Sequence, residues 1–303
     1  MQMEEIANGL EFPEGPIAMA DGSVLLVEIK RGTLTRVQPD GSTEVVADLG
    51  GGPNGAAIGP DGAVYICNNG GFEWHDLNGL IIPGGKPDDY SGGRIERVDL
   101  ETGEVRELYR ECDGIPLNGP NDIVFDKEGG FWFTDLGKTH GRVKDLGALY
   151  YAQPDGSSIT QVVFPIETPN GVGLSPDEKV VYVASTEAGR LWGFDIEKPG
   201  AIISAGPPNH GRMIGNPTGL NYFDSLAVDA EGNVCVATIF NGGITSISPE
   251  GDIEHFPTDD FITTNICFGG NDLRTAYLTL SSSGRLVKCT WPRAGLPLNY
   301  LNK

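Results

Sequence analysis

Six oxygen-bearing side chains stand at equivalent places in the chain, each next to a short run of small or apolar residues. Five of the local frames read PEG, PNG, PND, PNG and TTN, and the sixth reads FDS. Two of these side chains are carboxylates and four are carboxamides, and none is His or Cys. They are Glu14, Asn54, Asn121, Asn170, Asp224 and Asn265.

Carboxylate and amide oxygens are the ligands of hard divalent cations. If the six side chains meet, a cation between the two acids offsets the free energy that burying them together would cost. Ca²⁺ is the expected ion, with Mg²⁺, Mn²⁺ and Zn²⁺ as further options. The alternative is that Asn, Asp and Gly before a strand are ordinary turn residues. Their recurrence in register favours the cation site.

The side chains belong to a sixfold internal repeat. A turn followed by an alternating strand begins at Met19, Gly59, Asp126, Ser175, Asp229 and Gly269. A second strand follows each copy, beginning at Gly32, Gly93, Gly147, Gly189, Gly242 and Gly284. Most copies continue through a turn into a third extended segment, and a small-residue strand precedes each copy. The repeat therefore predicts an all-β, six-bladed propeller with four-stranded blades.

The two ends of the chain are expected to pair. The sixth repeat has no outermost strand of its own, because the chain breaks at Pro292 after GRLVKCTW. The N-terminal segment MEEIA can supply that strand and close the ring. Residues 1–303 are then one domain, and the six oxygen-bearing side chains converge where the innermost strands begin. We call these six residues the axial set.

Composition excludes several classes of partner. The formal net charge is −21, with a sequence pI near 4.4, so nucleic acid would be repelled over most of the surface. No stretch reaches the roughly 18 apolar residues of a membrane span, and the N-terminus does not read as a signal peptide. Five cysteines without CxxC spacing are expected to be reduced and buried. We predict a cytoplasmic protein with a small-molecule substrate and leave its oligomeric state open.

The longest connection on the axial-set side is expected to be a lid. Residues 70–93 join two strands of the second blade and are much longer than a hairpin requires. Trp74 and His75 are candidate substrate contacts there, together with Phe72 and Tyr90. The segment 206–223 leads into Asp224 and offers Arg212. The alternative for each of these side chains is that it packs within its loop or faces solvent and has no role in substrate binding.

Four motifs carry a resemblance to a known family. Together they extend over essentially the whole chain, which resembles the gluconolactonase, regucalcin and luciferin-regenerating-enzyme-like propellers, with diisopropyl fluorophosphatase as a more distant relative. The motifs are LEFPEGP at 10–16, NGPNDIVFDKEGGFWFTD at 118–135, TPNGVGLSPD at 168–177 and YFDSLAVDAEGNVCVA at 222–237.

The resemblance implies Ca²⁺ or a similar ion held by Glu14, Asn170 and Asp224, with Asn121 as a further ligand or substrate contact. It also implies the opening of small lactones. The expected mechanism is metal-assisted hydrolysis, in which the ion acts as a Lewis acid and Asp224 activates water. Asn121 would orient the substrate, and Asn54 and Asn265 would line its pocket. The aromatic side chains expected around the entrance to the site, in the loop 70–93, indicate a substrate less polar than a simple sugar lactone.

Two other functions remain as alternatives. A phosphotriesterase-like hydrolase could use the same cation, although Ala227 stands where the fluorophosphatase branch would have an acidic ligand of a second ion. A calcium-binding propeller without turnover is the other alternative. Serine hydrolase and zincin functions have no support, because the chain has no GxSxG and no HExxH.

Overall fold

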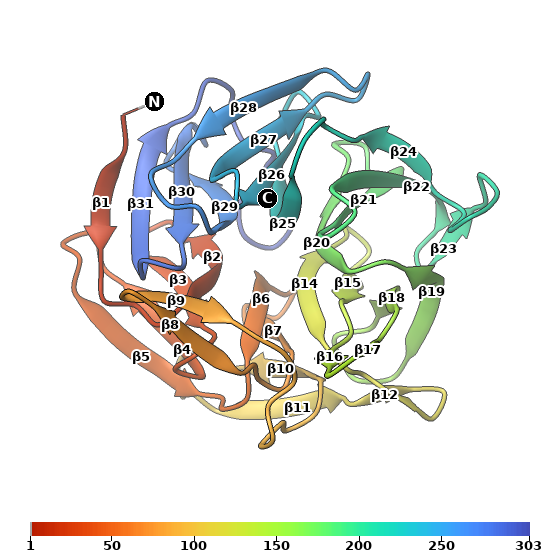
Figure 1. Ribbon diagram of the computed structural model, residues 1–303, viewed down its shortest axis with the longest axis horizontal. Helices are drawn as coiled ribbons and strands as arrows, with labels where there is room; N and C mark the ends of the chain where they lie inside the picture. The colour runs from red at the N-terminus through yellow and green to blue at the C-terminus, as the bar shows by residue number, and fades with distance from the viewer. Residues whose placement is uncertain (1) are drawn as a thin grey trace.

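The computed structural model describes residues 2–303 and shows six small sheets arranged around a common axis (Figure 1). This confirms the predicted six-bladed propeller. Each blade runs from an innermost strand at the axis to an outermost strand at the circumference. Residues 2–303 form no helix, and hence none that is long and apolar enough to cross a membrane.

Four-stranded antiparallel sheets form the first three blades. Blade 1 comprises β2 (Pro13–Ala18), β3 (Val24–Glu28), β4 (Thr33–Val37) and β5 (Thr43–Asp48). Blade 2 comprises β6 (Pro53–Ile58), β7 (Val64–Asn68), β10 (Arg94–Val98) and β11 (Val105–Tyr109). Blade 3 comprises β14 (Pro120–Phe125), β15 (Phe131–Asp135), β18 (Gly147–Ala152) and β19 (Ile159–Ile166).

The remaining blades follow the same order from the axis outwards. Blade 4 comprises β20 (Pro169–Leu174), β21 (Val180–Ser185) and β22 (Arg190–Lys198), with β23 (Ala201–Ile203) and β24 (Arg212–Gly215) both paired to β22. Blade 5 comprises β25 (Tyr222–Val228), β26 (Val234–Ile239), β27 (Gly243–Ile247) and β28 (Ile253–Pro257). Blade 6 comprises β29 (Thr263–Gly269), β30 (Thr275–Leu280), β31 (Arg285–Thr290) and β1 (Glu4–Ala7).

The N-terminal strand closes the ring as predicted. In blade 6, β1 pairs antiparallel with β31, and Glu4 lies opposite Lys288. The Lys288 ammonium also lies 3.1 Å from a carboxylate oxygen of Glu4. Closure gives the third strand of blade 6 a partner, so blade 6 does not present β31 as an open edge.

Connections between the strands contain three short hairpins. Two lie in the loops of blades 2 and 3, and one precedes β14. They are β8 (Trp74–Leu77) with β9 (Leu80–Pro83), β12 (Glu111–Cys112) with β13 (Ile115–Pro116), and β16 (Thr139–His140) with β17 (Val143–Lys144).

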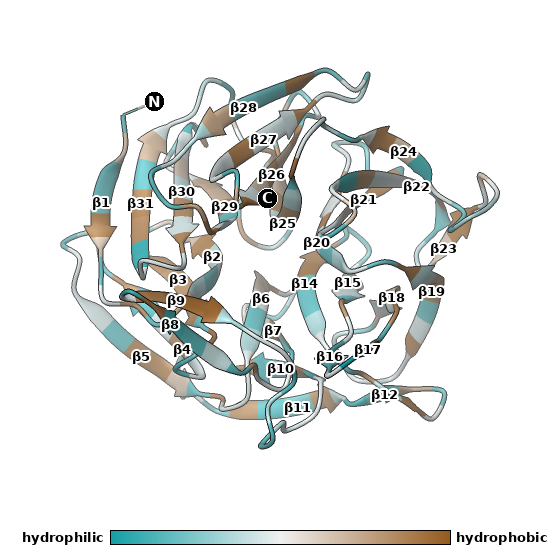
Figure 2. Ribbon diagram, viewed as in Figure 1, coloured by the Kyte–Doolittle hydropathy of each residue, from teal (hydrophilic) through white to brown (hydrophobic). Residues whose placement is uncertain are grey.

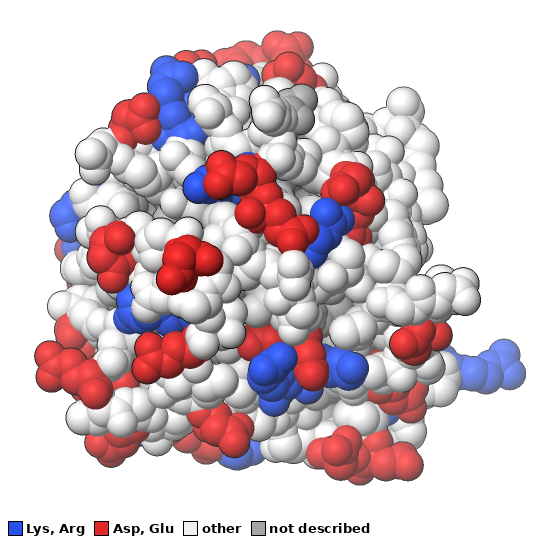
Figure 3. Space-filling view, turned by 90° about the vertical axis from the view of Figure 1, so that its left-hand side faces the viewer, with Lys and Arg blue, Asp and Glu red and all other residues white. Residues whose placement is uncertain are grey.

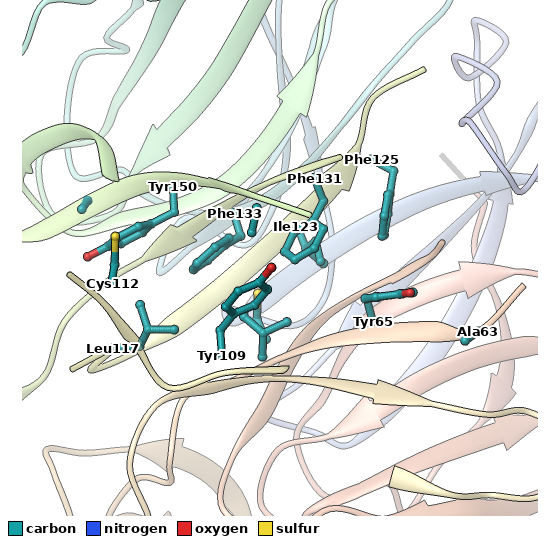
Figure 4. Packing of buried hydrophobic residues seen from close by; sticks show 14 residues of the cluster. Ala63, Tyr65, Tyr109, Cys112, Leu117, Ile123, Phe125, Phe131, Phe133 and Tyr150 are labelled. Carbon is teal, nitrogen blue, oxygen red and sulfur yellow. The ribbon is translucent and has the colours of Figure 1, made fainter. Parts of the chain in front are cut away.

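The core lies between neighbouring blades. Strand residues alternate between the two faces of each sheet, and apolar side chains from adjacent blades pack into shared buried clusters. Figure 2 shows hydrophobic residues along the strands of the blades. Between blades 2 and 3, Tyr65 packs edge-on against Phe125, and Phe133 stacks on Tyr150 with ring centroids 5.0 Å apart (Figure 4). The five cysteines are buried and unpaired by disulfides, as predicted.

The C-terminal segment crosses the end of the propeller where the innermost strands finish. Gly295 pairs with Asp229 just after β25, and Asn299 donates to the carbonyl oxygen of Phe125 at the end of β14. A cavity of about 100 Å³ lies between this segment and the innermost strands, and Leu296 and Leu298 contribute to its wall. The C-terminal segment therefore covers the end of the propeller opposite to the one at which the innermost strands begin.

Surface charge on the face that Figure 3 shows is distributed rather than concentrated. On the side formed by blades 6 and 1, acidic side chains are scattered over the face with basic side chains between them (Figure 3). This pattern agrees with the net charge of −21.

Candidate metal centre and active site

The axial set occupies the same position in every blade. Each member is the second or third residue of an innermost strand, and each is buried, with exposed fractions from 2% for Glu14 to 9% for Asp224. The six innermost strands contact one another in sequence around the axis. The structure therefore brings all six predicted side chains to one end of the propeller.

A β-bulge accompanies every axial residue. The pairing of each innermost strand with its neighbour shifts register at or just after this point, for example between Glu14 and Ile17 in β2 and between Phe223 and Leu226 in β25. A bulge bends its strand and redirects a side chain out of the regular alternation. Six equivalent bulges explain how side chains from separate sheets share one region.

Glycine after an axial residue allows the close approach of adjacent blades. A Cβ atom on Gly15 would lie 2.6 Å from the carbonyl oxygen of Asn54, and the φ angle of Gly15 is +53°. A Cβ atom on Gly171 would lie 2.7 Å from the carbonyl oxygen of Asp224. No larger residue fits these two contacts without movement of the backbone. The recurrent PEG and PNG frames thus reflect the packing of the ring.

Blade 3 has Asp122 where the PNG frame has glycine. Its carboxylate accepts hydrogen bonds from the backbone N–H groups of Val172 in blade 4 and Ile123, both at 3.0 Å. Burial raises the pKa of Asp122 to about 7, against the effect of these hydrogen bonds. Asp122 was not among the predicted site residues, although its replacement of Gly in PND was a visible signal.

Three buried oxygens of the axial set have no hydrogen-bond donor. Glu14 Oε1, Asn121 Oδ1 and Asn170 Oδ1 accept no hydrogen bond from any residue that the structure describes. An unsatisfied buried acceptor costs about 1–3 kcal/mol. A cation that binds these oxygens would remove that cost, so the three atoms are suited to ligation.

Asn265 supports Glu14. Its Nδ2 donates to Glu14 Oε2 at 2.6 Å, and its Oδ1 accepts from the backbone N–H of Ile266 at 2.8 Å. Both ends of the amide are therefore occupied. This arrangement directs Glu14 and leaves its other oxygen, Oε1, open.

Burial disfavours the ionisation of both carboxylates of the axial set. Burial, reinforced by the Asp224 charge, raises the pKa of Glu14 well above its ordinary value. Burial likewise raises the pKa of Asp224 to about 7, although a hydrogen bond from the Asn170 side chain acts in the opposite direction. A divalent cation would supply the missing positive charge.

The donor set fits a hard cation. Within residues 2–303, no three His, Cys, Asp or Glu side chains form a group that could hold a metal ion. A metal site here must therefore include the amide oxygens of Asn, which are typical ligands of Ca²⁺. Glu14, Asn121, Asn170 and Asp224 would hold it.

Comparison with known proteins assigns the family. Residues 12–282 match the family model described as the SMP-30/Gluconolactonase/LRE-like region. The chain belongs to this family. The match includes every member of the axial set, from Glu14 to Asn265.

Named relatives include two groups of lactonases. "Lactonase drp35" of Staphylococcus saprophyticus is 30% identical over 251 residues, which are 82% of this chain and 70% of the relative. "Gluconolactonase" of Zymomonas mobilis is 25% identical over 321 residues, with 94% of this chain and 80% of the relative covered.

Solved structures of the family share the fold. A gluconolactonase from Xanthomonas campestris superposes with a TM-score of 0.74 at 21% identity, covering 96% of this chain and 89% of that chain. The calcium-binding protein regucalcin from Agrobacterium tumefaciens gives a TM-score of 0.71 at 19% identity, covering 95% and 92%.

In this SMP-30/gluconolactonase-family chain, the last residues of the second strands hold the loops that lead to the axial set. Asp135, at the end of β15, accepts hydrogen bonds from the backbone N–H groups of Asn118 at 2.8 Å and Gly119 at 2.7 Å. Asn68, at the end of β7, accepts one from Gly52 at 2.9 Å.

The predicted rim residues are separated by the structure. Trp74 packs on Phe12, two residues before Glu14, with ring centroids 5.2 Å apart. His75 is exposed on the same strand, β8. Arg212 lies on β24 at the outer edge of blade 4, where it pairs with Asp195 of β22 at 3.2 Å. The structure thus brings Trp74, but not Arg212, to the side of the propeller that carries the axial set.

Proposed function

We propose that this chain is a lactone hydrolase that works with one divalent cation, most suitably Ca²⁺, bound by Glu14, Asn121, Asn170 and Asp224. The observation that carries the proposal is the set of three donor-less buried oxygens beside two buried carboxylates with raised pKa values. The names of the relatives, lactonase and gluconolactonase, support the reaction. The structural similarity to a calcium-binding regucalcin supports the choice of ion.

Asp224 supplies the acid–base chemistry. The bound cation would polarise the lactone carbonyl. In its carboxylate form, Asp224 takes a proton from water while the water oxygen bonds to the carbonyl carbon. The bond between that carbon and the ring oxygen then breaks, and the departing oxygen takes up the proton. The product is a hydroxy acid, and the amide of Asn121 orients the substrate during the reaction.

A lactone panel tests this function directly. Acid release from lactones of increasing apolar character would be followed with a pH indicator, with and without EDTA, and after Ca²⁺ is restored. We expect turnover that EDTA abolishes and Ca²⁺ recovers. Turnover of a phosphotriester or fluorophosphate alone would support the first alternative function. Cation binding without turnover of either class would support a non-catalytic propeller.

Asn265→Leu is expected to weaken cation binding by about 10- to 100-fold, the range typical for loss of an outer-sphere partner. The reason is that Glu14 loses the amide that directs it. Isothermal titration with Ca²⁺ measures the change. Asn299→Leu, which removes an amide at the opposite end of the axis, is the matched control and should keep the wild-type affinity. Equal affinities for the two variants would contradict the role of Asn265.

A further inference from the structure

Within residues 2–303, Lys138 is the only lysine with a buried side chain, and 5% of its surface is exposed. It follows β15 in the loop of blade 3. Its ammonium group donates to Asn69 Oδ1 at 3.0 Å and to the carbonyl oxygen of Gly71 at 2.7 Å. Both acceptors lie where the loop 70–93 leaves blade 2. A side chain of one blade therefore binds the base of the long loop of another.

Aromatic rings from the same loop enclose the ammonium group. Lys138 Nζ lies 3.7 Å from the ring centroid of Phe72 and 5.7 Å from that of Tyr90. Burial lowers the pKa of Lys138 to about 7, with Asp135 acting in the opposite direction. Cation–π contacts are stronger when they are shielded from water. The two hydrogen bonds and the Phe72 face thus offset part of the free energy of burying this charge.

The loop held by Lys138 reaches two other blades. Its hairpin, β8–β9, leaves blade 2 and crosses the blade 1 side of the propeller (Figure 1), and Figure 2 shows that β9 is largely hydrophobic. Trp74 packs on Phe12 of the segment that enters blade 1. The backbone N–H of Ile81 donates to the carbonyl oxygen of Ser282 in blade 6 at 2.9 Å. The hairpin therefore lies beside the approach to Glu14.

Lys138 also lies close to the segments that carry the axial set. Its partner Asn69 donates its backbone N–H to the carbonyl oxygen of Gly52 at 2.7 Å, two residues before Asn54. On its own blade, Lys138 is three residues from Asp135, which holds the segment leading to Asn121. The ammonium group of Lys138 is buried and its hydrogen bonds go to protein atoms. Any effect of Lys138 on the site is therefore transmitted through these segments.

We propose that Lys138 is a positioning residue that clamps the loop 70–93 onto blade 3 and so fixes the wall of the substrate site between blades 1 and 2. The effect on substrate binding rests on the proposed lactone hydrolysis. The effect on the loop itself does not depend on that function.

Lys138→Met, which keeps an unbranched side chain only one atom shorter and removes its charge, tests the clamp. Hydrogen–deuterium exchange in the loop should become at least about tenfold faster, since the amides of Glu73, Gly84 and Lys86 are bonded within the loop or to Thr139. Exchange in the blade strands should stay unchanged. KM for a lactone should rise by about tenfold with a smaller change in kcat, as expected when a binding wall is loosened.

Two further variants make the test decisive. Lys144→Met removes a partly exposed lysine of the same blade 3 loop that pairs with Glu187, and should match the wild type in both readouts. Phe72→Leu keeps the lysine and removes the aromatic face, and should give a smaller change in the same direction; it decides the question if Lys138→Met does not fold. Wild-type exchange and KM in a folded Lys138→Met protein would overturn the proposal. If the wild type opens no lactone, the proposed function fails. The exchange measurements would still show whether Lys138 holds the loop 70–93 in place.

Discussion

Asp224→Ala is expected to lower kcat/KM for lactone opening by about 10³-fold or more, with the propeller still folded. The carboxylate is both the proposed base and a cation ligand, and acid–base groups of this kind contribute about 10²- to 10⁴-fold to rate. Steady-state kinetics across the lactone panel measure the loss. Thermal unfolding in parallel separates loss of chemistry from loss of structure.

Asp224→Asn divides the two roles of the residue. The amide retains an oxygen for the cation and cannot accept the proton of water at neutral pH. Ca²⁺ binding that survives with turnover lost would assign Asp224 as the base. Asp61→Asn is the matched control, because Asp61 pairs with Arg97 on the blade surface at 2.7 Å and has no part in the site. A folded Asp224→Asn protein with wild-type turnover would reject the mechanism.

In the cation-free protein, the free energy of unfolding is expected to fall as pH rises from about 4 to above 7. The folded-state pKa of Asp224 is raised from 3.8 to about 7 by burial, and that of Glu14 is raised well above 4.5. The folded protein then binds more protons than the unfolded chain in this window, so the free energy of unfolding decreases with increasing pH. For Asp224 alone, the change amounts to roughly 4 kcal/mol.

Added Ca²⁺ should reverse this trend. The cation replaces the bound protons, so its stabilising effect should be small near pH 5 and large near pH 8. Thermal melts with EDTA or millimolar Ca²⁺ across this range provide the measurement. Glu14→Gln combined with Asp224→Asn should flatten much of the pH dependence in EDTA. Asp122, whose pKa is also raised to about 7, and other buried carboxylates such as Asp135 should contribute to the remainder. If the stabilisation by Ca²⁺ does not change with pH, Ca²⁺ does not replace protons on Glu14 and Asp224, and this prediction is wrong.

Local sequence patterns did not predict which residues contact each other across blades. Arg212 was expected near the substrate because it precedes Asp224 in the chain, but the structure pairs its strand with the outer side of β22. Lys138 gave no local signal, since its partners are 67 and 69 residues away. Asn265 was identified as an axial residue, whereas its specific bond to Glu14 spans 251 residues.

The sequence by itself determined the number of blades, the closure of the ring by β1 and the convergence of the axial set. These features follow from a local pattern repeated along the chain, because each blade forms from consecutive segments that have the same turns and the same strand alternation. Only the tertiary structure decided which axial oxygens lack donors, how Asp122 joins blades 3 and 4, and which side chain holds the long loop. Those properties depend on hydrogen bonds and burial between segments that are distant in the chain, which no local pattern encodes.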